Sequence, residues 1–276
     1  MKIMSLPMKF YEMCGTEEPS LTAYLQEESE EIKMSHLRPA VIVCPGGAYR
    51  FRSDREAEVI ALTFLAKGCQ SFVMNYSVAP AKFPCALTEL AAAVATVRTH
   101  AEEWKIDPNK IYVCGFSAGG HLTASLGTLW QEDFLKELLK DSFGAENSLW
   151  KPNGLILCYP VITMGKYTHE ESRDLLLGEN APEEKIQALS LENRVTDSVP
   201  PVFIWHTSED EAVPVENTLQ FVTALQKAKV PYEMHVFEKG EHGLALCDEV
   251  TESLPSQVVP DNAGWVDMVL RWMKRR

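Results

Sequence analysis

The sequence predicts an α/β domain in which a mostly parallel sheet of about eight strands is covered by helices on both faces. Short apolar runs without in–out alternation recur along the chain, and such runs are typical of strands buried on both faces. Segments with helical spacing of apolar residues separate these runs. The chain of 276 residues is long enough to bury one large core. We therefore expect one domain over residues 1–276 with a small insertion.

Six apolar runs are expected as parallel strands, and two earlier runs, MKFYEM at 8–13 and LTAYLQ at 21–26, as antiparallel edge strands. The stretch 160–198 fits no strand–helix unit, because it is polar and acidic with one helical patch near 182–189. We expect it to form a cap over the carboxyl edge of the sheet. The six runs are 40–44, 71–76, 111–114, 154–159, 202–206 and 232–237, and the expected helices are 54–67, 85–104, a stretch ending near 130, 215–228 and 263–275.

The charge balance argues against polyanionic partners. Lysine and arginine number 26 and aspartate and glutamate 39, which gives a net charge of −13. Such a field repels nucleic acid and anionic membrane surfaces, so neither is expected as a partner. No apolar run approaches the roughly 18 residues of a membrane span, and Pro7 and Lys9 interrupt any signal-peptide core at the start.

The seven cysteines follow no C-x-x-C pattern, and four of them lie in or beside strand-like runs. Buried free thiols in a reducing compartment are the better interpretation, so a cytoplasmic location is expected. No metal or other cofactor is implied, and the sequence leaves open whether the chain forms a homodimer. The four cysteines are Cys44, Cys69, Cys114 and Cys158.

The strongest chemical signal is the motif G-F-S-A-G at residues 115–119. It follows an apolar strand and precedes a helix, which is the context of a serine held on a tight strand-to-helix turn. Glycines at 115 and 119 avoid collisions with the neighbouring backbone. The helix amino end places the N–H of Ala118 where an oxyanion would form. Ser117 is therefore the candidate nucleophile.

A nucleophilic serine needs a base and a carboxylate that orients the base. In proteins with this serine turn, the carboxylate and then the histidine follow the serine in the sequence. His242 lies in a loop directly after the last expected strand, whereas His169 falls in the insertion and His235 within a strand. The acid is expected in the turn after the 202–206 strand. There Asp210 is favoured because Val213 and Pro214 start the next helix after it. The adjacent Glu209 and Glu211 stay open as alternatives, and metal binding by His206, Asp210 and His242 lacks a recognised ligand spacing.

A second backbone donor for an oxyanion is expected in the loop after an early strand. Residues 45–49, P-G-G-A-Y, end the 40–44 strand at that place, and glycines let the backbone turn its N–H groups toward a substrate oxygen. Gly47 and Ala48 are the expected donors. Tyr49 and Tyr76 are candidate walls of a substrate pocket.

Taken in order, PGGAY, NYSVAP, IDPNKIYVCGFSAGGHL, DEAVP and KGEHG resemble the α/β-hydrolase superfamily. Within it the chain is similar to the esterase/lipase group related to acetyl-xylan esterases and hormone-sensitive-lipase-like carboxylesterases. The resemblance implies Ser117 as nucleophile, Asp210 as acid and His242 as base. It also implies oxyanion donors at Gly47, Ala48 and Ala118, and a structural role for His121. The family's common H-G-G-G is replaced here by Pro45 through Ala48.

These residues predict a serine carboxylesterase that hydrolyses short-chain acyl esters, with an acetylated sugar as the first expectation for its substrate. The sugar rests on the resemblance alone. A small-peptide or amide hydrolase of the same fold is the alternative, because the fold does not choose between them. A non-catalytic ligand-binding protein on the same scaffold is a third hypothesis, although such proteins often lose one of the three reactive residues.

Overall fold

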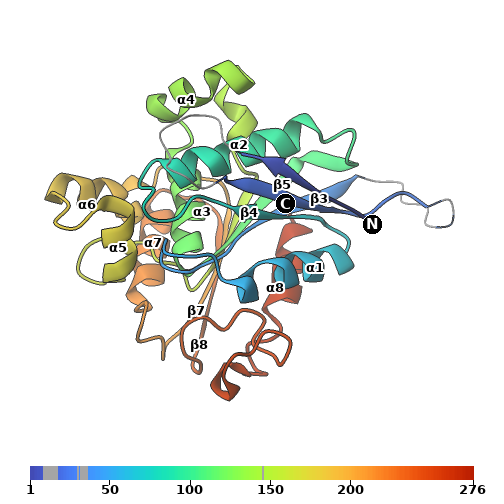
Figure 1. Cartoon of the computed structure of the whole chain (residues 1–276). Helices are drawn as coiled ribbons and strands as arrows, with labels where there is room; N and C mark the ends of the chain where they lie inside the picture. Colours follow the sequence, from blue (N-terminus) through green and yellow to red (C-terminus); the bar gives the residue numbers. More distant parts are fainter. Residues whose placement is uncertain (9–17, 30, 32–36, 145) are drawn as a thin grey trace.

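The computed structural model describes residues 1–8, 18–29, 31, 37–144 and 146–276. An eight-stranded sheet runs through its centre in the order β1-β2-β4-β3-β5-β6-β7-β8 (Figure 1). β2 pairs antiparallel with both of its neighbours, β1 and β4, and the strands β3 to β8 are parallel to one another. The strands are β1 Lys2–Pro7, β2 Ser20–Leu25, β3 Arg38–Cys44, β4 Gln70–Asn75, β5 Ile106–Phe116, β6 Gly154–Cys158, β7 Val202–Thr207 and β8 Tyr232–Phe237.

The predicted fold class is confirmed, with local differences at the strands. All six runs expected as parallel strands are strands, and 21–26 contains the edge strand β2. The expected strand 8–13 lies, apart from Met8, outside the described residues, and the strand paired with β2 is instead β1. β5 begins five residues before the expected start, because a register shift opposite residues 38–40 lets the polar stretch 107–110 continue the strand.

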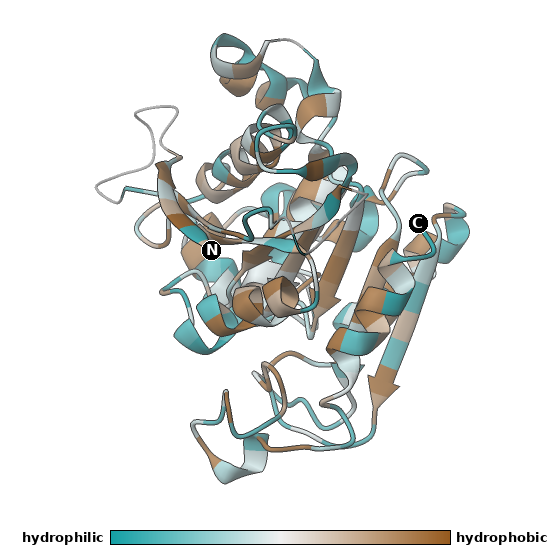
Figure 2. Cartoon of the chain, turned by 90° about the vertical axis from the view of Figure 1, so that its right-hand side faces the viewer, coloured by the Kyte–Doolittle hydropathy of each residue, from teal (hydrophilic) through white to brown (hydrophobic). Residues whose placement is uncertain are grey.

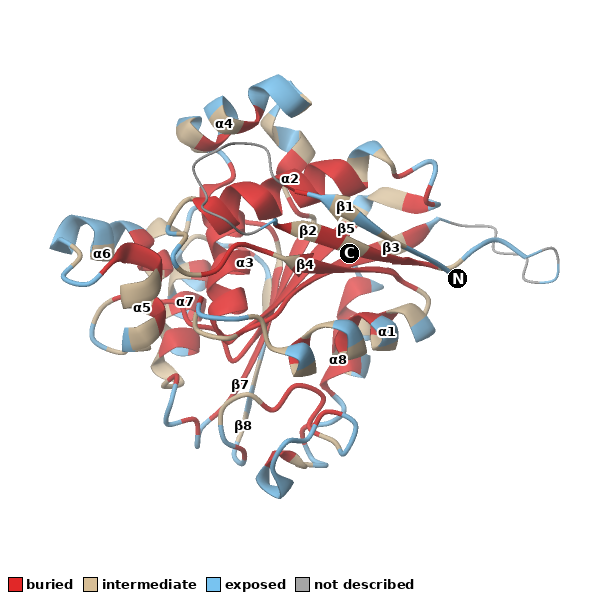
Figure 3. Ribbon diagram, viewed as in Figure 1, coloured by how far each residue is buried: buried red, intermediate tan, exposed pale blue. Residues whose placement is uncertain are grey.

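Helices cover both faces of the sheet. α1 and α8 pack on one face through apolar residues such as Phe64 and Trp265, while α2, α3 and α7 cover the other. The central strands are coloured predominantly hydrophobic in Figure 2. In Figure 3 most of their length is buried, and α3 is buried throughout. The helices are α1 Glu58–Ala66, α2 Cys85–Thr99, α3 Ser117–Leu129, α4 Asp133–Phe143, α5 Glu170–Leu177, α6 Glu183–Leu189, α7 Glu216–Lys227 and α8 Trp265–Met273, with short 3-10 turns η2 Asp54–Glu56, η3 Asn147–Trp150, η4 Leu191–Arg194 and η5 Pro255–Gln257.

Two helices, α4 and α5, were not predicted. The buried residues of α4 are Leu135 and Leu139 alone. Its apolar stripe is therefore narrow. α5 starts with two glutamates behind His169, whose side chain accepts a hydrogen bond from the N–H of Ser172 and so caps the helix. Histidine is not one of the usual capping residues. The helix expected at 182–189 is present as α6.

The expected free thiols are present at Cys44, Cys69, Cys114 and Cys158, which are all buried. Cys85 differs, because it is disulfide-bonded, so the expectation of free thiols does not extend to it. No helix in the described part of the chain is long and apolar enough to cross a membrane.

Buried His121 joins the insertion to the core. Its Nε2 lies 3.0 Å from the carbonyl oxygen of Leu189, at the end of α6, and its Nδ1 lies 3.0 Å from the hydroxyl of Tyr49. A carbonyl can only accept, so Nε2 carries the proton and Nδ1 accepts from Tyr49. Burial lowers the pKa of His121 from 6.5 to about 4, although the hydrogen bond to Leu189 opposes the shift.

This histidine makes stability depend on pH. Because its pKa is lower in the folded state than in the unfolded state, its contribution is complete above pH 6.5 and is lost as the pH falls through 4. The loss is about 3 kcal/mol over that range. We expect His121→Gln to flatten the fall in unfolding free energy between pH 7 and pH 4.5, as measured by urea titration. An equal slope in the wild type and the variant would contradict this assignment.

Candidate active site

The turn between β5 and α3 holds Ser117 in a backbone conformation that few side chains adopt. Its φ is 51°, and the serine lies at the first position of α3. A Cβ on Gly115 would lie 2.2 Å from the carbonyl oxygen of Gly119, and a Cβ on Gly119 would lie 2.2 Å from that of Cys44. Only glycine fits at either place. The turn therefore presses the start of α3 against the end of β3.

Ser117, His242 and Asp210 are brought together from segments far apart in the sequence. The Oγ of Ser117 lies 2.8 Å from Nε2 of His242, and Nδ1 of the same ring lies 2.6 Å from Oδ2 of Asp210. A carboxylate accepts, so Nδ1 donates to Asp210 and Nε2 is left to accept the proton of the serine hydroxyl. This is the arrangement in which an imidazole can act as a general base toward a hydroxyl.

Asp210 is the acid that the structure places against His242. Its side chain is buried, and Oδ1 accepts hydrogen bonds from the N–H groups of Ala212 and Val213 at 3.1 and 2.8 Å. The neighbouring Glu209 points elsewhere, since it pairs with Lys239 at 2.8 Å, and Glu211 is exposed. The geometry thus favours Asp210 over both alternatives.

His206 is a second histidine on Asp210 that the sequence analysis considered only as a metal ligand. Its Nε2 lies 3.2 Å from Oδ2 of Asp210 and 2.9 Å from the carbonyl oxygen of Val213, while Nδ1 accepts from the hydroxyl of Thr218 at 2.8 Å. The ring is fully buried in β7. Burial by itself would raise the pKa of Asp210, but hydrogen bonds from His206 and His242 outweigh it and hold that pKa well below its usual range. No group of three or more candidate ligands within the described residues is arranged to hold a metal ion.

The loop after β3 passes beside Ser117. A Cβ on Gly46 would lie 2.9 Å from both the carbonyl oxygen of Phe116 and Cβ of Ser117, so Gly46 lies close against this turn. Gly47, Ala48 and Tyr49 all have positive φ, at 125°, 56° and 59°. Among the described residues, the N–H groups of Gly47 and Ala48 have no hydrogen-bond acceptor. The N–H of Ala118 is in the first turn of α3, where helices leave donors unused. The three expected donors are therefore available at one edge of the sheet.

Tyr49 and Tyr76, the two candidate pocket walls from the sequence, are both buried. Their exposed fractions are 2% and 0%. The hydroxyl of Tyr76 donates to the carbonyl oxygen of Pro45 at 2.6 Å, and that of Tyr49 donates to His121. The two rings meet edge to face, with their centroids 6.1 Å apart. Both tyrosines thus support the loop after β3 from within the core.

The insertion approaches this site at the start of α5. Burial and then the charge of His242 lower the pKa of His169, and Asp210 opposes the shift, so His169 lies within electrostatic reach of both. Glu171 of the same helix pairs with Arg50, which follows the loop after β3. The amino end of α5 is thereby tied to the site.

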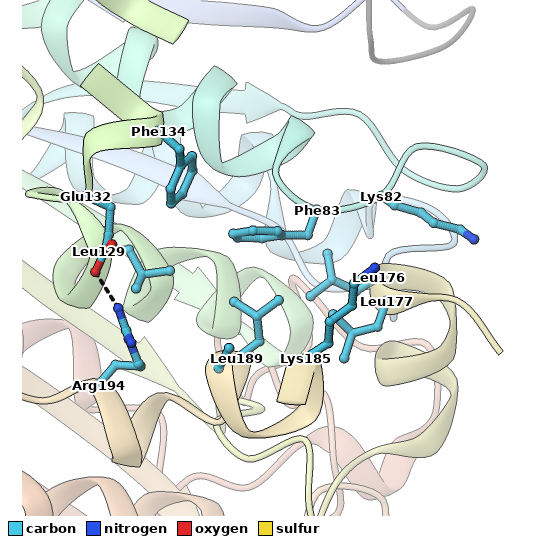
Figure 4. A pocket seen from close by; sticks show the side chains of 11 residues that line it. Lys82, Phe83, Leu129, Glu132, Phe134, Leu176, Leu177, Lys185, Leu189 and Arg194 are labelled. Atoms are coloured by element: carbon cyan, nitrogen blue, oxygen red, sulfur yellow. Dashed lines mark hydrogen bonds and ion pairs between the residues drawn. The ribbon is translucent and has the colours of Figure 1, made fainter. Parts of the chain in front are cut away.

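The same insertion also walls a separate cavity of about 340 Å³ (Figure 4). Figure 4 shows Phe83, Phe134 and Leu189 facing one another across it, with the ion pair of Glu132 and Arg194 at one end. Ser117 is not among the residues that line it. This cavity is distinct from the site around His242.

Two residues that the sequence analysis did not single out complete the surroundings. Glu56, in η2, and Tyr159, directly after β6, are buried and hydrogen-bonded to each other at 2.7 Å. The ring of Tyr159 packs edge-on against His242, with the centroids 5.1 Å apart. Its place as the last residue of the expected strand 154–159 was the one available signal for Tyr159. Glu56 lies in a polar stretch that carries no such signal.

Known proteins similar to this chain include a xylanase and an acetylxylan esterase. The BD-FAE family model matches residues 27–225. Endo-1,4-beta-xylanase B of Butyrivibrio fibrisolvens is 38% identical over 84% of this chain and 35% of its own length. Acetylxylan esterase of Xylanibacter ruminicola is 29% identical over 75% of this chain and 41% of its own length. The chain thus spans less than half the length of these two curated relatives.

Solved structures match over nearly the whole chain. An acetyl ester-xyloside bifunctional hydrolase from Caldicellulosiruptor lactoaceticus has a TM-score of 0.83 and 34% identity, covering 99% of this chain and 96% of that one. A carboxylesterase from Lactobacillus plantarum WCFS1 has a TM-score of 0.84 and 27% identity, covering 100% and 98%. With its eight-stranded sheet and a family model matched over most of its length, the chain belongs to the BD-FAE family of α/β hydrolases.

Proposed function

We propose that this chain is a serine carboxylesterase that removes short acyl groups from small neutral esters. The observation that carries the proposal is the continuous hydrogen-bonded line from Ser117 through His242 to Asp210, set beside unused backbone donors. The solved structures that match nearly the whole chain are named as ester hydrolases, which supports the same reaction class.

In the proposed reaction the Oγ of Ser117 attacks the ester carbonyl carbon while Nε2 of His242 takes its proton. The carbonyl oxygen becomes an oxyanion, which the N–H groups of Gly47, Ala48 and Ala118 stabilise. The ester C–O bond then breaks, and His242 returns the proton to the leaving alcohol. A water molecule attacks the acyl-enzyme in the same way and releases the acid. Asp210 holds the neutral imidazole in the tautomer that accepts from serine, and it stabilises the imidazolium that forms once the proton has been taken.

We further propose that residues 1–276 form one domain with 160–198 as its cap, which the pairing of Glu171 with Arg50 supports. An acetylated sugar as substrate rests on the names of the xylan-linked relatives. Hydrolysis of amides is the competing function, and a non-catalytic receptor is a third. A cytoplasmic location remains a prediction from the sequence, and whether the chain forms a homodimer stays open.

The reactive serine can be tested directly. We expect a fluorophosphonate probe to label the wild type. Neither Ser117→Ala nor Ser117→Cys should be labelled at the wild-type rate. Ser117→Ala and His242→Ala should each lose nearly all turnover of p-nitrophenyl acetate while keeping the wild-type circular dichroism spectrum. If either variant retained more than a tenth of the activity, the role assigned to that residue would be wrong. A folded wild type that takes no label would favour a receptor.

Because two histidines contact Asp210, we expect substitutions at this carboxylate and at His206 to reduce activity by different amounts. Asp210→Asn should be severely impaired, because an amide N–H₂ turned toward Nδ1 favours the wrong imidazole tautomer. His206→Gln should lose less, about ten-fold in kcat/KM, because two backbone N–H groups still hold Oδ1. Glu209→Gln, one residue before Asp210, is the matched control and should stay within two-fold of the wild type. A severe loss of kcat/KM in Glu209→Gln together with a small loss in Asp210→Asn would show that Glu209, and not Asp210, is the acid.

Acyl preference follows from the insertion and the charge. The segment 160–198 is rich in charged residues and has no long apolar stretch of the kind expected in a lid that opens on lipid. A long acyl chain needs a continuous apolar trough, since each buried CH₂ gains about 0.8 kcal/mol. We expect kcat/KM to be highest for acetyl or propionyl p-nitrophenyl esters and to fall steeply beyond about six carbons, without interfacial activation. A maximum at eight carbons or more would favour a lipase.

A further inference from the structure

The carboxyl group of Glu56 is buried beneath the loop after β3. The residue is 3% exposed and ends the 3-10 turn η2. Its Oε2 accepts a hydrogen bond from the N–H of Gly46 at 2.8 Å, and its Oε1 accepts one from the hydroxyl of Tyr159 at 2.7 Å. Burying a carboxyl group is costly unless its oxygens are satisfied. The two bonds meet that need, one on each oxygen.

The hydrogen-bonded chain continues from Tyr159 to the loop that carries His242. The hydroxyl of Tyr159 donates to Glu56 and accepts from the N–H of Ala245 at 2.8 Å. Ala245 follows His242 by three residues and has a φ of 52°. The Tyr159 ring packs against the imidazole at an interplanar angle of 73°. One carboxyl group is therefore shared, through Tyr159, between the loop after β3 and the His242 loop.

The contact at Gly46 is close to the reacting atoms. Gly46 precedes the expected donor Gly47 and lies close against the turn that holds Ser117. Its carbonyl oxygen also accepts from the N–H of Ser53 at 3.0 Å. Both backbone polar groups of Gly46 are therefore held by the segment 53–56. A shift of Gly46 would move the N–H of Gly47 relative to Ser117. Distances in an oxyanion site matter at this scale, because a donor is effective only within about 2.7–3.1 Å of the oxyanion.

We propose that Glu56 is a positioning residue for the reaction, which fixes the oxyanion donors and His242 in a common frame around Ser117. The proposal rests on the proposed esterase function. Glu56 does not touch the reacting atoms and acts through Gly46 on one side and through Tyr159 on the other. It serves a structural purpose as well, since it satisfies two buried donors, so the test has to separate geometry from stability.

Three variants make that separation. In Glu56→Gln the amide oxygen can still accept from the N–H of Gly46, but the N–H₂ group then faces Tyr159 and can only donate, so the hydroxyl of Tyr159 loses its acceptor. Tyr159→Phe removes only the hydroxyl and keeps the ring against His242. Asp54→Asn is the matched control, because Asp54 is an exposed carboxylate in the same turn. Each would be assayed for kcat and KM with p-nitrophenyl acetate, for thermal midpoint, and for the inhibition constant of 1,1,1-trifluorobutan-2-one, whose tetrahedral adduct needs the oxyanion donors.

We expect Glu56→Gln and Tyr159→Phe each to lose about 10- to 100-fold in kcat, less than the roughly 10²–10³ lost on deleting a donor. KM should stay within about three-fold, and the inhibition constant of the ketone should rise by a factor similar to the loss in kcat. The double variant should lose little more than the worse single variant, because both act through one chain of bonds. Asp54→Asn should match the wild type within two-fold.

Lower thermal midpoints with kcat and ketone affinity within two-fold of the wild type would overturn the proposal, since Glu56 would then be structural only. If Glu56→Gln does not fold, Tyr159→Phe decides the question by the same criteria. A folded wild type that neither hydrolyses the ester nor reacts with fluorophosphonate would refute the proposed function and, with it, this role. An active wild type with unaffected variants would refute the role of Glu56 alone.

Discussion

The close approach of two backbones at the end of β3 sets the geometry of the whole site. Any side chain at position 119 would collide with the carbonyl oxygens of Cys44 and Pro45, at 2.2 and 2.4 Å. Because Gly119 has none, α3 starts directly against the loop that follows β3. That contact brings Ser117, in the turn after β5, and the backbone donors of the loop after β3 to the same edge of the parallel sheet. The other groups of the site are arranged around this contact.

A buried acid keeps the imidazole oriented only while it remains ionised. Taking Asp210 out of water works against ionisation, and the structure compensates with donors on both oxygens. His206 has a distinct part in this compensation, since it gives Asp210 a donor that does not move with the loop carrying His242. The carboxylate is thus charged before a substrate arrives, as preorganised electrostatic catalysis requires.

Periodicity and turn chemistry were sufficient to predict the parallel strands, most of the helices between them and the residues that meet at Ser117, but not α4, α5 or β1. Those residues lie in the turns and loops that follow β5, β7 and β8, and the carboxyl ends of parallel strands lie at one edge. The sequence could not show that Tyr49 and Tyr76 are buried, because a tyrosine beside a loop looks the same whether its hydroxyl faces water or a carbonyl oxygen. Glu56 was missed for a related reason. Its partners are a backbone N–H and a tyrosine more than a hundred residues away, and no local pattern encodes such a contact.

Residues in a strained backbone conformation gather in the loops of the site. Non-glycine residues with positive φ include Ala48, Ser117, Tyr159 and Ala245, at 56°, 51°, 37° and 52°. Such conformations cost about 1–3 kcal/mol each and persist only where the surroundings hold them. Here the surroundings are polar as well as packed, since the hydroxyl of Tyr159 joins Glu56 to the N–H of Ala245. A hydrogen bond fixes direction as well as distance. Buried hydrogen bonds between the loops can therefore fix the relative positions of these strained turns more closely than apolar packing alone would.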